Sequence, residues 1–357
     1  MLKTIFKKNI KIKKNIIISN NDKCFIVAEI SANHSGSLDL LKKTILKAKQ
    51  IGVDAVKIQT YQANTITLNV KNKHFLIDDK SIWKGKSLFD LYKSAQTPFH
   101  WHNEIFKFAK KNKIICFSAP FDISAVDLLR KNDCPIYKIA SPEIEDLNLI
   151  EKIAKTKKPI IISTGIANEK NIINALNVCK KQKNFRIILL NCISSYPAKN
   201  NELNLKYINI LKKYCPLVGY SDHSNSDMAS IISVASGAKV IEKHFKLNNK
   251  IKTPDSSFSY DPIQFKNLIK KIRETELMMG SENINKRNIL KKKLKTVTRS
   301  IFYSNNINRG EKISLKNIKS VRPGTGLKLK YFNKILGKRV RKNCKFGHPV
   351  KLKDIIF

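Results

Sequence analysis

Eight short apolar runs, with helical segments between them, occupy most of the chain between Cys24 and His244. Each run is as apolar as a strand buried on both faces, which is typical of parallel sheets. The runs are Cys24–Ile30, Ala55–Gln59, Ile114–Ser118, Ile136–Ile139, Pro159–Ser163, Ile187–Asn191, Leu217–Tyr220 and Lys239–His244. Amphipathic stretches that predict helices follow several runs, among them Leu38–Gln50, Ser124–Lys131, Glu169–Lys181 and Pro262–Met279.

Eight such units predict an α/β fold, a closed (β/α)8 TIM barrel of about 250 residues. An open doubly wound sheet is the alternative. No G-x-G-x-x-G string follows any run, so a dinucleotide-binding fold has no support.

Two histidines follow the last two runs. His223 ends the string Ser-Asp-His, and His244 ends Glu-Lys-His. A helix predicted over 226–236 would bring both imidazoles to the carboxyl ends of adjacent strands, where barrels carry their chemistry. Imidazole is the commonest metal ligand in proteins, so the pair predicts a metal site. Two unrelated polar residues at strand ends are the alternative.

Lys57 and Lys138 end two of the buried runs. An unpaired ammonium inside a barrel is costly, so we expect both lysines to face an anion. Gln59 lies two residues after Lys57 and therefore points to the same side of its strand. Hydroxyl groups also follow the runs, at Ser141, Ser163, Ser194 and Ser221. Together with helix N-termini they suit a phosphate or a carboxylate, although a helix N-cap is the alternative for any single serine.

Beyond Met279 the helical pattern gives way to short alternating segments separated by turn signals. The candidate strands are Ser300–Tyr303, Glu311–Ile313, Val321–Pro323, Lys338–Val340 and Pro349–Leu352. They predict a small β-rich domain of about 60 residues. We therefore expect an N-terminal extension (1–22), a barrel (23–280), a basic linker (281–295) and a small domain (296–357). Within the extension, Ile10–Ser19 predicts a short strand or hairpin under the barrel floor.

The formal net charge of +42 does not by itself predict a nucleic-acid partner. The excess is mostly lysine spread from end to end, as in proteins of AT-rich genomes, and no RNP, zinc-finger or basic-zipper signature is present. We expect no specific nucleic-acid function. Seven cysteines without a C-x-x-C spacing predict free thiols in a reducing cytoplasm. No apolar run reaches membrane-spanning length, so no membrane partner is expected.

Ordered motifs along the chain resemble those of the sialic acid synthase family. The strings that carry the likeness are Ala28-Glu29-Ile30-Ser31-Ala32-Asn33-His34, Val56-Lys57-Ile58-Gln59, Tyr137-Lys138-Ile139-Ala140-Ser141, Ile162-Ser163-Thr164-Gly165, Ser221-Asp222-His223, Glu242-Lys243-His244 and Pro254-Asp255-Ser256. The likeness runs from about Phe25 to the C-terminus. Within the family, Ser31-Ala32, Thr65-Ile66-Thr67 and the segment 81–92 favour members that form pseudaminic acid.

The resemblance implies a condensation of phosphoenolpyruvate with an open-chain acetamido sugar that releases phosphate. The matching phosphoenolpyruvate contacts are Lys57, Lys138, Ser141, Ser163, Ser194 and Ser221. Glu29 matches the carboxylate that handles protons, and the matching sugar contacts are Gln59, Tyr196 and Asp255. His223 and His244 match the ligands of a divalent metal, usually Mn²⁺, with Mg²⁺ or Co²⁺ as alternatives.

The small C-terminal domain resembles the antifreeze-like (SAF) domain of these synthases. In the family this domain covers the barrel mouth of the partner subunit, which implies a homodimer. Arg322 matches the arginine that the domain offers to the sugar. A surface arginine in a turn is the alternative.

Two positions depart from the family pattern. Ala119 stands where the family has a threonine after the third strand, so a hydroxyl on the phosphate side is missing, and Ser118 or water is the candidate substitute. Thr253 stands in a loop that usually begins with two glycines, so the backbone before Asp255 has less freedom. Whether either change weakens substrate binding stays open.

The expected sugar, 2,4-diacetamido-2,4,6-trideoxy-L-altrose, rests on the resemblance alone. The nearest alternative is the same reaction on another sugar, giving legionaminic or N-acetylneuraminic acid. A metal aldolase that uses pyruvate is more distant and would release no phosphate. A basic scaffold without catalysis is a third alternative, and the intact set Glu29, Lys57, Lys138, His223 and His244 argues against it.

Overall fold

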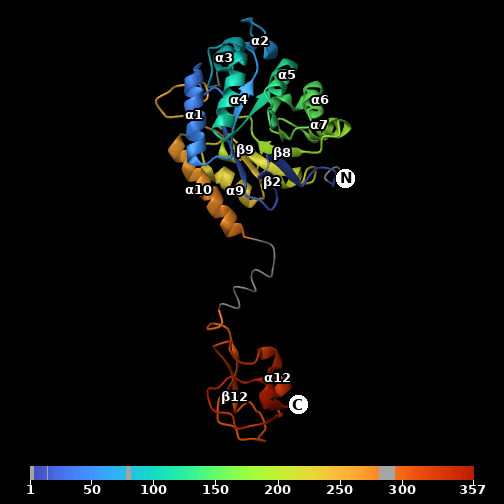
Figure 1. Cartoon of the computed structure of the whole chain (residues 1–357), viewed down its shortest axis with the longest axis vertical. Coiled ribbons are helices and arrows are strands. Elements are labelled where there is room, and N and C mark those ends of the chain that lie inside the picture. The colour runs from blue at the N-terminus through green and yellow to red at the C-terminus, as the bar shows by residue number, and fades with distance from the viewer. Residues whose placement is uncertain (1–3, 14, 78–81, 281–293) are drawn as a thin grey trace. The chain divides into compact units, whose positions relative to one another are not determined.

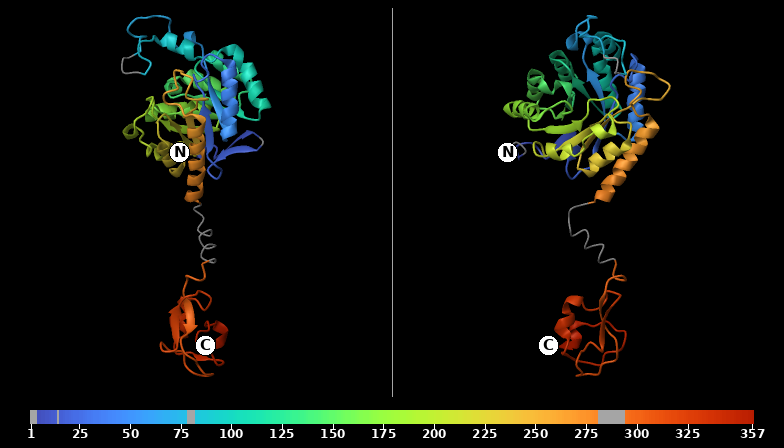
Figure 2. Two further views of the ribbon diagram at one scale, coloured as in Figure 1. Left: turned by 90° about the vertical axis from the view of Figure 1, so that its left-hand side faces the viewer. Right: turned by 180° about the vertical axis from the view of Figure 1, so that it is seen from behind.

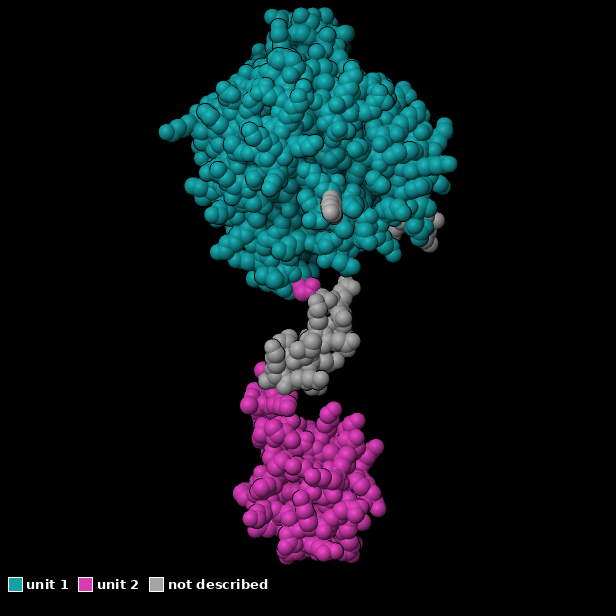
Figure 3. All heavy atoms as spheres, in the orientation of Figure 1, with its two compact units in different colours: residues 1–279 teal, residues 280–357 magenta. Residues whose placement is uncertain are grey.

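The computed structural model describes residues 4–13, 15–77, 82–280 and 294–357. The chain divides into two compact units, residues 1–279 and 280–357, which are teal and magenta in Figure 3. Apart from residues 294 and 295, the predicted basic linker 281–295 lies outside the described residues.

Unit 1 is a closed barrel of eight parallel strands, which confirms the predicted fold (Figure 1). Around the barrel the strands follow the order β10-β3-β4-β5-β6-β7-β8-β9. Their bounds are β3 (Phe25–Glu29), β4 (Ala55–Thr60), β5 (Ile115–Pro120), β6 (Tyr137–Ile139), β7 (Ile160–Ser163), β8 (Ile187–Cys192), β9 (Val218–Asp222) and β10 (Val240–His244). Each strand coincides with one of the apolar runs, because a strand buried on both faces needs apolar residues on both sides.

Helices cover the outside of the barrel (Figure 2). They are α1 (Leu38–Ile51), α4 (His102–Lys111), α5 (Ile123–Lys131), α6 (Leu147–Lys155), α7 (Glu169–Lys181), α8 (Tyr207–Leu211), α9 (Asp227–Ala235) and α10 (Pro262–Met279). Two more, α2 (Ala63–Ile66) and α3 (Leu88–Ala95), lie in the long connection from β4 to β5. Short 3-10 helices are η2 (Phe99–Trp101), η3 (Pro142–Glu145) and η4 (Asn200–Glu202).

Helix α1 shows how the sequence sets these bounds. The Ser37 side chain accepts a hydrogen bond from the backbone N–H of Leu40, which caps the first turn. Gly52 ends the helix in the left-handed region at φ +93°, which a glycine adopts without strain. Between them Leu41, Ile45 and other apolar residues at helical spacing are buried in the barrel core.

A hairpin of β1 (Asn9–Lys13) and β2 (Ile16–Ser19) lies in the segment where the sequence suggested a strand or hairpin. Ile10 and Ile18 are buried in the core of the barrel unit. The backbone N–H of Lys7 donates to the carbonyl of Phe185, just before β8 begins, at 2.9 Å. The hairpin therefore covers the amino end of the barrel, the end opposite the strand termini that carry the histidines.

Unit 2 has its own core, built around Ile301, Tyr303, Ile318 and Val350. Its elements are β11 (Ser300–Tyr303), β12 (Ile318–Val321), β13 (Arg339–Val340), β14 (Ile355–Ile356), α12 (Phe332–Ile335), η5 (Leu329–Tyr331) and η6 (Leu352–Asp354). The predicted strand Val321–Pro323 was wrong in position, because Pro323 lacks the N–H that a ladder needs and the strand ends before it. The predicted strands Glu311–Ile313 and Pro349–Leu352 form only isolated bridges.

All seven cysteines are buried free thiols. Among the helices of the described ranges, none combines the length and the apolar character that crossing a bilayer requires.

Candidate active site

Residues two apart point to the same side of a strand, so Ser221 and His223 share one side at the end of β9, and Glu242 and His244 share one side of β10. The register pairs Ser221 of β9 with Glu242 of β10, and it pairs His244 of β10 with Glu29 of β3. The hydroxyl of Ser221 donates to Oε1 of Glu242 at 2.9 Å. The imidazole rings of His223 and His244 lie 5.6 Å apart between centroids. The two histidine strings therefore meet at the carboxyl end of the barrel, as predicted.

Two lysines and two glutamates form a buried charge cluster beside the histidines. Nζ of Lys57 lies 2.7 Å from Oε2 of Glu29 and 3.3 Å from Oε1 of Glu242. Nζ of Lys138 lies 2.9 Å from the same Oε1 of Glu242. The exposed fraction of each of these side chains is 5% or less. Both lysines therefore face anions, as expected, and in the chain itself these anions are the carboxylates of Glu29 and Glu242.

Burial and the neighbouring charges set the protonation of this cluster. Burial raises the pKa of Glu29 to about 7, although the charge of Lys57 opposes the rise. For Glu242, burial opposes ionisation, but the charges of Lys138 and Lys57 outweigh it and hold the pKa well below its usual value. Near neutral pH Glu242 is thus ionised, while Glu29 is close to half protonated and is able to accept or give a proton.

Several buried polar atoms of the site have no hydrogen-bond partner among the residues that the structure describes. They are Oε1 of Glu29, Oε2 of Glu242 and Nδ1 of His244. Buried polar groups in proteins are nearly always paired. Three unpaired atoms at one end of the barrel therefore indicate that a ligand or ordered water completes this site.

Serine hydroxyls converge around Gly165, in the loop that follows β7. A Cβ atom at this position would lie 2.9 Å from Oγ of Ser141 and 2.8 Å from Oγ of Ser194. The backbone N–H of Ile166 donates to Oγ of Ser141 at 2.9 Å. Ser163 is buried at the end of β7, whereas Ser194 is exposed. Only glycine fits this close approach, so Gly165 lets the hydroxyls of Ser141 and Ser194 gather beside the loop.

The histidines have the form in which imidazole binds metals. Nδ1 of His223 donates to the carbonyl of Ile193 at 2.6 Å, so its lone pair is on Nε2. Burial lowers the pKa of His223 to about 4, and burial together with His223 holds that of His244 well below 6.5. In the described part of the chain, no three side chains among His, Cys, Asp and Glu are grouped to hold a metal. Two neutral imidazoles, one with an unpaired nitrogen, fit a metal with open positions.

Aromatic rings form an apolar wall next to the histidines. The ring of Tyr196 lies 4.3 Å from that of His223, and Phe258 lies 4.9 Å from His244. Trp83 packs outside both, 6.0 Å from Tyr196 and 6.4 Å from Phe258. Nε1 of Trp83 donates to the carbonyl of Pro254 at 2.8 Å, which ties the β4–β5 connection to the loop after β10.

The remaining predicted sugar contacts also lie in the barrel unit. Asp255 is buried, its Oδ2 lies 3.9 Å from Nδ1 of His244, and burial raises its pKa. Gln59 follows Lys57 on β4 and is partly exposed. The hydroxyl of Thr253 donates to Oδ1 of Asn33. The Thr253 departure therefore gives the loop before Asp255 a side-chain anchor.

The prediction that Ser118 substitutes for the hydroxyl missing at Ala119 was wrong. Ser118 pairs in register with Ile58, so its side chain points away from the side that carries Lys57. Its hydroxyl donates to the carbonyl of Ile58 at 3.0 Å and lies 2.6 Å from Oγ1 of Thr60. Both hydroxyls belong to a buried network with His102 of α4, on the helix side of the strand.

Two glutamates of the site were not assigned a role from the sequence. Glu242 had a usable signal, because it precedes His244 by two residues and so shares its side of β10. Glu143 follows β6, and burial raises its pKa to about 7. Its Oε2 is buried without a partner in the described ranges. Glu143 lies in a 3-10 turn, where no periodicity indicates a direction for the side chain.

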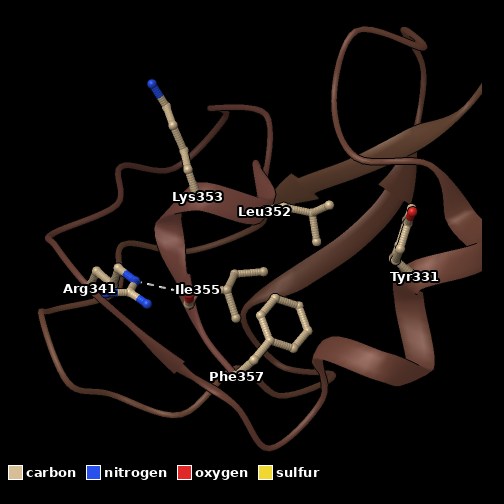
Figure 4. Close-up of a pocket in the computed structure, with 6 residues that line it drawn as sticks. All are labelled: Tyr331, Arg341, Leu352, Lys353, Ile355 and Phe357. Atoms are coloured by element: carbon tan, nitrogen blue, oxygen red, sulfur yellow. Dashed lines mark hydrogen bonds between the residues drawn. The ribbon is translucent and has the colours of Figure 1, made fainter.

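Arg322 lies in unit 2, exposed in the turn after β12. Its reach into a partner's barrel stays a prediction. The same unit has a cavity of about 730 Å³, lined by Tyr331, Arg341, Leu352, Lys353, Ile355 and Phe357 (Figure 4). In it Nε of Arg341 donates to the carbonyl of Ile355 at 3.2 Å. None of the predicted site residues lines this cavity.

Comparison with known proteins places these features in a family. The chain matches the NeuB family over residues 44–284 and the SAF domain over residues 298–356. It is 42% identical over 338 residues to the pseudaminic acid synthase of Campylobacter jejuni, which covers 94% of this chain and 98% of that protein. The N,N'-diacetyllegionaminic acid synthase of the same organism is 38% identical over 90% of this chain and 97% of its own length.

Among solved structures, the N-acetylneuraminic acid synthetase of Leptospira borgpetersenii in complex with citrate is similar to this chain. The TM-score is 0.70 at 29% identity, over 81% of this chain and 97% of that one.

Proposed function

The chain belongs to the NeuB family, and we propose that it condenses phosphoenolpyruvate with open-chain 2,4-diacetamido-2,4,6-trideoxy-L-altrose to give pseudaminic acid and phosphate. The observation that carries this proposal is the 42% identity to a pseudaminic acid synthase over 94% of the chain. The charge cluster and the two neutral histidines at the barrel's carboxyl end are the residue types that this chemistry needs.

Phosphoenolpyruvate would bind among Lys57, Lys138 and the serine hydroxyls around Gly165. Ammonium groups and hydroxyls are strong donors to phosphate and carboxylate oxygens. Because Glu29 already lies 2.7 Å from Lys57, an incoming anion would disfavour the ionised form of Glu29. Glu242 would stay ionised between the two lysines and keep their charges from repelling each other.

When the methylene carbon of phosphoenolpyruvate bonds to the aldehyde carbon, cationic character develops on the adjacent carbon, which bears the phosphate oxygen. Water adds there, and phosphate then leaves with cleavage of its carbon–oxygen bond. Ionised Glu29 would stabilise the cation or accept the proton of the water, and its pKa of about 7 suits both roles. Lys57 and Lys138 would offset the charge of the departing phosphate.

We assign His223 and His244 to a divalent metal, Mn²⁺ first and Mg²⁺ or Co²⁺ as alternatives. When bound, such a metal would polarise the sugar aldehyde toward attack by the methylene carbon of phosphoenolpyruvate. Replacing either histidine with alanine should abolish metal-stimulated phosphate release while the far-ultraviolet circular dichroism stays unchanged. Full activity in both variants would remove the metal assignment.

The sugar would lie against the aromatic wall, with Gln59, Tyr196 and Asp255 as polar contacts. Trp83, Tyr196 and Phe258 provide apolar surface on one side of the histidines. A 6-deoxy sugar with two acetamido groups carries three methyl groups, and apolar surface suits methyl groups better than it suits hydroxyls.

We further propose a cytoplasmic homodimer, in which Arg322 of the partner subunit completes each barrel mouth. The buried free thiols suit a reducing compartment. Mixing an Arg322→Ala protein with a Lys57→Ala protein should restore activity, because mixed dimers then hold one intact site. No activity at any mixing ratio would remove the cross-subunit role.

The deciding experiment measures phosphate release from phosphoenolpyruvate with Mn²⁺ and one sugar at a time. Release with the altrose sugar alone would establish the reaction and its product. Release with N-acetylmannosamine or with the legionaminic acid precursor would keep the reaction and change the sugar. A product formed from pyruvate without phosphate release would favour the aldolase alternative.

A further inference from the structure

A buried ion pair lies behind the two histidines, on the opposite side of their strands. Nζ of Lys243 is 3.0 Å from Oδ2 of Asp222, and both side chains are 0% exposed. Asp222 directly precedes His223, and Lys243 directly precedes His244. Because side chains alternate along a strand, the pair points outward while both imidazoles point inward. The pair also joins β9 to β10, the strands that carry the histidines.

Hydrogen bonds extend this pair into the backbone around both histidines. Oδ1 of Asp222 accepts from the backbone N–H of Ser224 at 2.9 Å and from its hydroxyl at 2.7 Å. Oδ2 accepts from the hydroxyl of Ser230 on α9 at 2.6 Å. Nζ of Lys243 donates to the carbonyl of Ser224 at 2.7 Å. Residue 224, which follows His223, is thus held at its N–H, its hydroxyl and its carbonyl.

The strand of His244 is fixed in a similar way. Nζ of Lys243 lies 4.3 Å from the ring centroid of Tyr260. The backbone N–H of Tyr260 in turn donates to the carbonyl of His244 at 2.9 Å. Both neighbours of His223 are therefore tied to one ionic centre, and His244 is tied to it through Lys243, which precedes it, and through its own carbonyl, which accepts from Tyr260.

We propose that Asp222 and Lys243 are positioning residues, which set the distance and direction between His223 and His244 for the divalent metal. The inference rests on the proposed function, because it takes the two histidines as metal ligands. A buried ion pair is a weak source of stability compared with well-packed apolar residues, but its directional bonds favour a single geometry. Residues that orient ligands from behind typically change metal affinity about 10- to 100-fold when they are replaced.

The amino end of the same barrel offers a matched control. Arg273 of α10 and Asp54, which precedes β4, form an ion pair at 3.3 Å. This pair also links two elements, and Oδ2 of Asp54 accepts from the backbone N–H of Ile26 at 2.7 Å. This pair lies at the amino end of the barrel and contacts neither histidine. If Asp222 and Lys243 served only to stabilise the fold, loss of either pair should therefore change the affinity for Mn²⁺ equally.

The test compares the double variants D222N/K243M and D54N/R273M, each of which removes both members of an ion pair, although the second also takes Arg273 away from Glu276. Binding of Mn²⁺, without either substrate, is followed by the electron paramagnetic resonance signal of the free ion. We expect the dissociation constant of D222N/K243M to rise about 10- to 100-fold and that of D54N/R273M to stay unchanged. K243R, which keeps a cation beside Asp222, should recover most of the affinity.

Unchanged Mn²⁺ affinity in folded D222N/K243M would overturn the positioning role, as would an equal loss in both double variants. If D222N/K243M does not fold, S230A replaces it, since it removes a single hydrogen bond to Asp222. Weaker binding in S230A would support the role, and unchanged binding would contradict it. Failure of the unchanged protein to bind Mn²⁺ would instead refute the metal part of the proposed function, which separates the two ideas.

Discussion

Both ends of the barrel hold charged side chains, but the hydrogen-bond partners and the solvent exposure of these side chains differ between the two ends. At the floor, Nη1 of Arg273 donates to the carbonyl of Cys24 at 2.8 Å and to Glu276 at 3.0 Å, and Nη2 reaches Asp54. The Arg273 side chain is 26% exposed, so water also solvates it. At the carboxyl end, Lys57 and Glu29 are almost fully buried, and polar atoms remain unpaired.

This difference indicates which end of the barrel contributes to the free energy of unfolding and which end is kept for binding a ligand. A charge that is partly solvated and fully bonded adds modestly to the free energy of unfolding. Buried charges with unpaired atoms reduce that free energy, so a protein keeps them where a ligand will use them. In barrels, the carboxyl ends of the strands are also where active sites lie. Substitutions at the two ends should therefore affect different measurements.

The largest effect on activity is expected from Lys138→Met at the carboxyl end. The substitution removes a donor to the substrate anion, and kcat/KM for phosphoenolpyruvate should fall about 10²- to 10³-fold. Glu242 keeps Lys57 as a partner at 3.3 Å, so the free energy of unfolding should change little. Phosphate release and urea unfolding measure the two quantities.

Lys152→Met is the matched control for that prediction. Nζ of Lys152 lies 2.9 Å from Oδ1 of Asp127 on the outer helix layer, and the Lys152 side chain is 33% exposed. Its substitution should leave kcat/KM unchanged. If Lys138→Met lost most of its stability and kept its activity, the contrast between the two ends would be wrong.

A second, smaller effect concerns the pH dependence of Glu29. Its proposed roles need the ionised carboxylate, and burial raises its pKa to about 7. The ionised fraction therefore grows as the pH rises through neutrality, and kcat/KM should increase about tenfold from pH 6 to pH 8. A glutamate with an ordinary pKa would give no change over this range.

The control for this pH dependence is Glu29→Gln, which cannot ionise. Any part of the profile that comes from ionisation of the substrate phosphate should persist in its residual activity. The part that comes from Glu29 should vanish. An identical profile in both proteins would assign the pH dependence to the substrate and leave Glu29 with no titrating role.

The sequence located the strands of the barrel well but could not show how its charges pair. The apolar runs are local signals, because each parallel strand must be apolar along its whole length. Alternation also put Gln59 on the same side of its strand as Lys57, since it needs only neighbouring residues. The bond from Lys138 to Glu242 joins residues 104 positions apart across the barrel, and no local pattern carries that information.

Register explains the errors that remain. Ser118 and Ala119 are adjacent, so one step along β5 decides which of them faces the charge cluster, and the apolar run does not mark that step. In unit 2 the strands have two to four residues, too few for a period of two to stand out. Trp83 was part of a segment that favoured one branch of the family, but its contact with Pro254 depends on the folded loops.

A third and weaker effect is expected from Trp83→Ala. The side chain forms the outer layer of the aromatic wall, so its loss should raise KM for the sugar about five- to tenfold. KM for phosphoenolpyruvate should stay unchanged, because Trp83 packs on Tyr196 and Phe258 rather than on the lysines. Steady-state kinetics with each substrate varied in turn measures both constants.

Trp101→Ala is the control, because the other tryptophan packs against His34, away from the aromatic wall. It should leave KM for the sugar unchanged. An equal rise of KM for both substrates in Trp83→Ala would mean that the residue supports the whole mouth rather than the sugar side.

The smallest effect on activity, and a clear effect on stability, is expected from Arg273→Met at the floor. The substitution removes hydrogen bonds to Cys24, Asp54 and Glu276, and urea unfolding should show a loss of about 1 to 3 kcal/mol. Phosphate release at saturating substrate should stay within about twofold, because the floor pair touches no group of the site. A protein with normal stability but much slower phosphate release would show that the floor also shapes the site, and the division between the two ends would then fail.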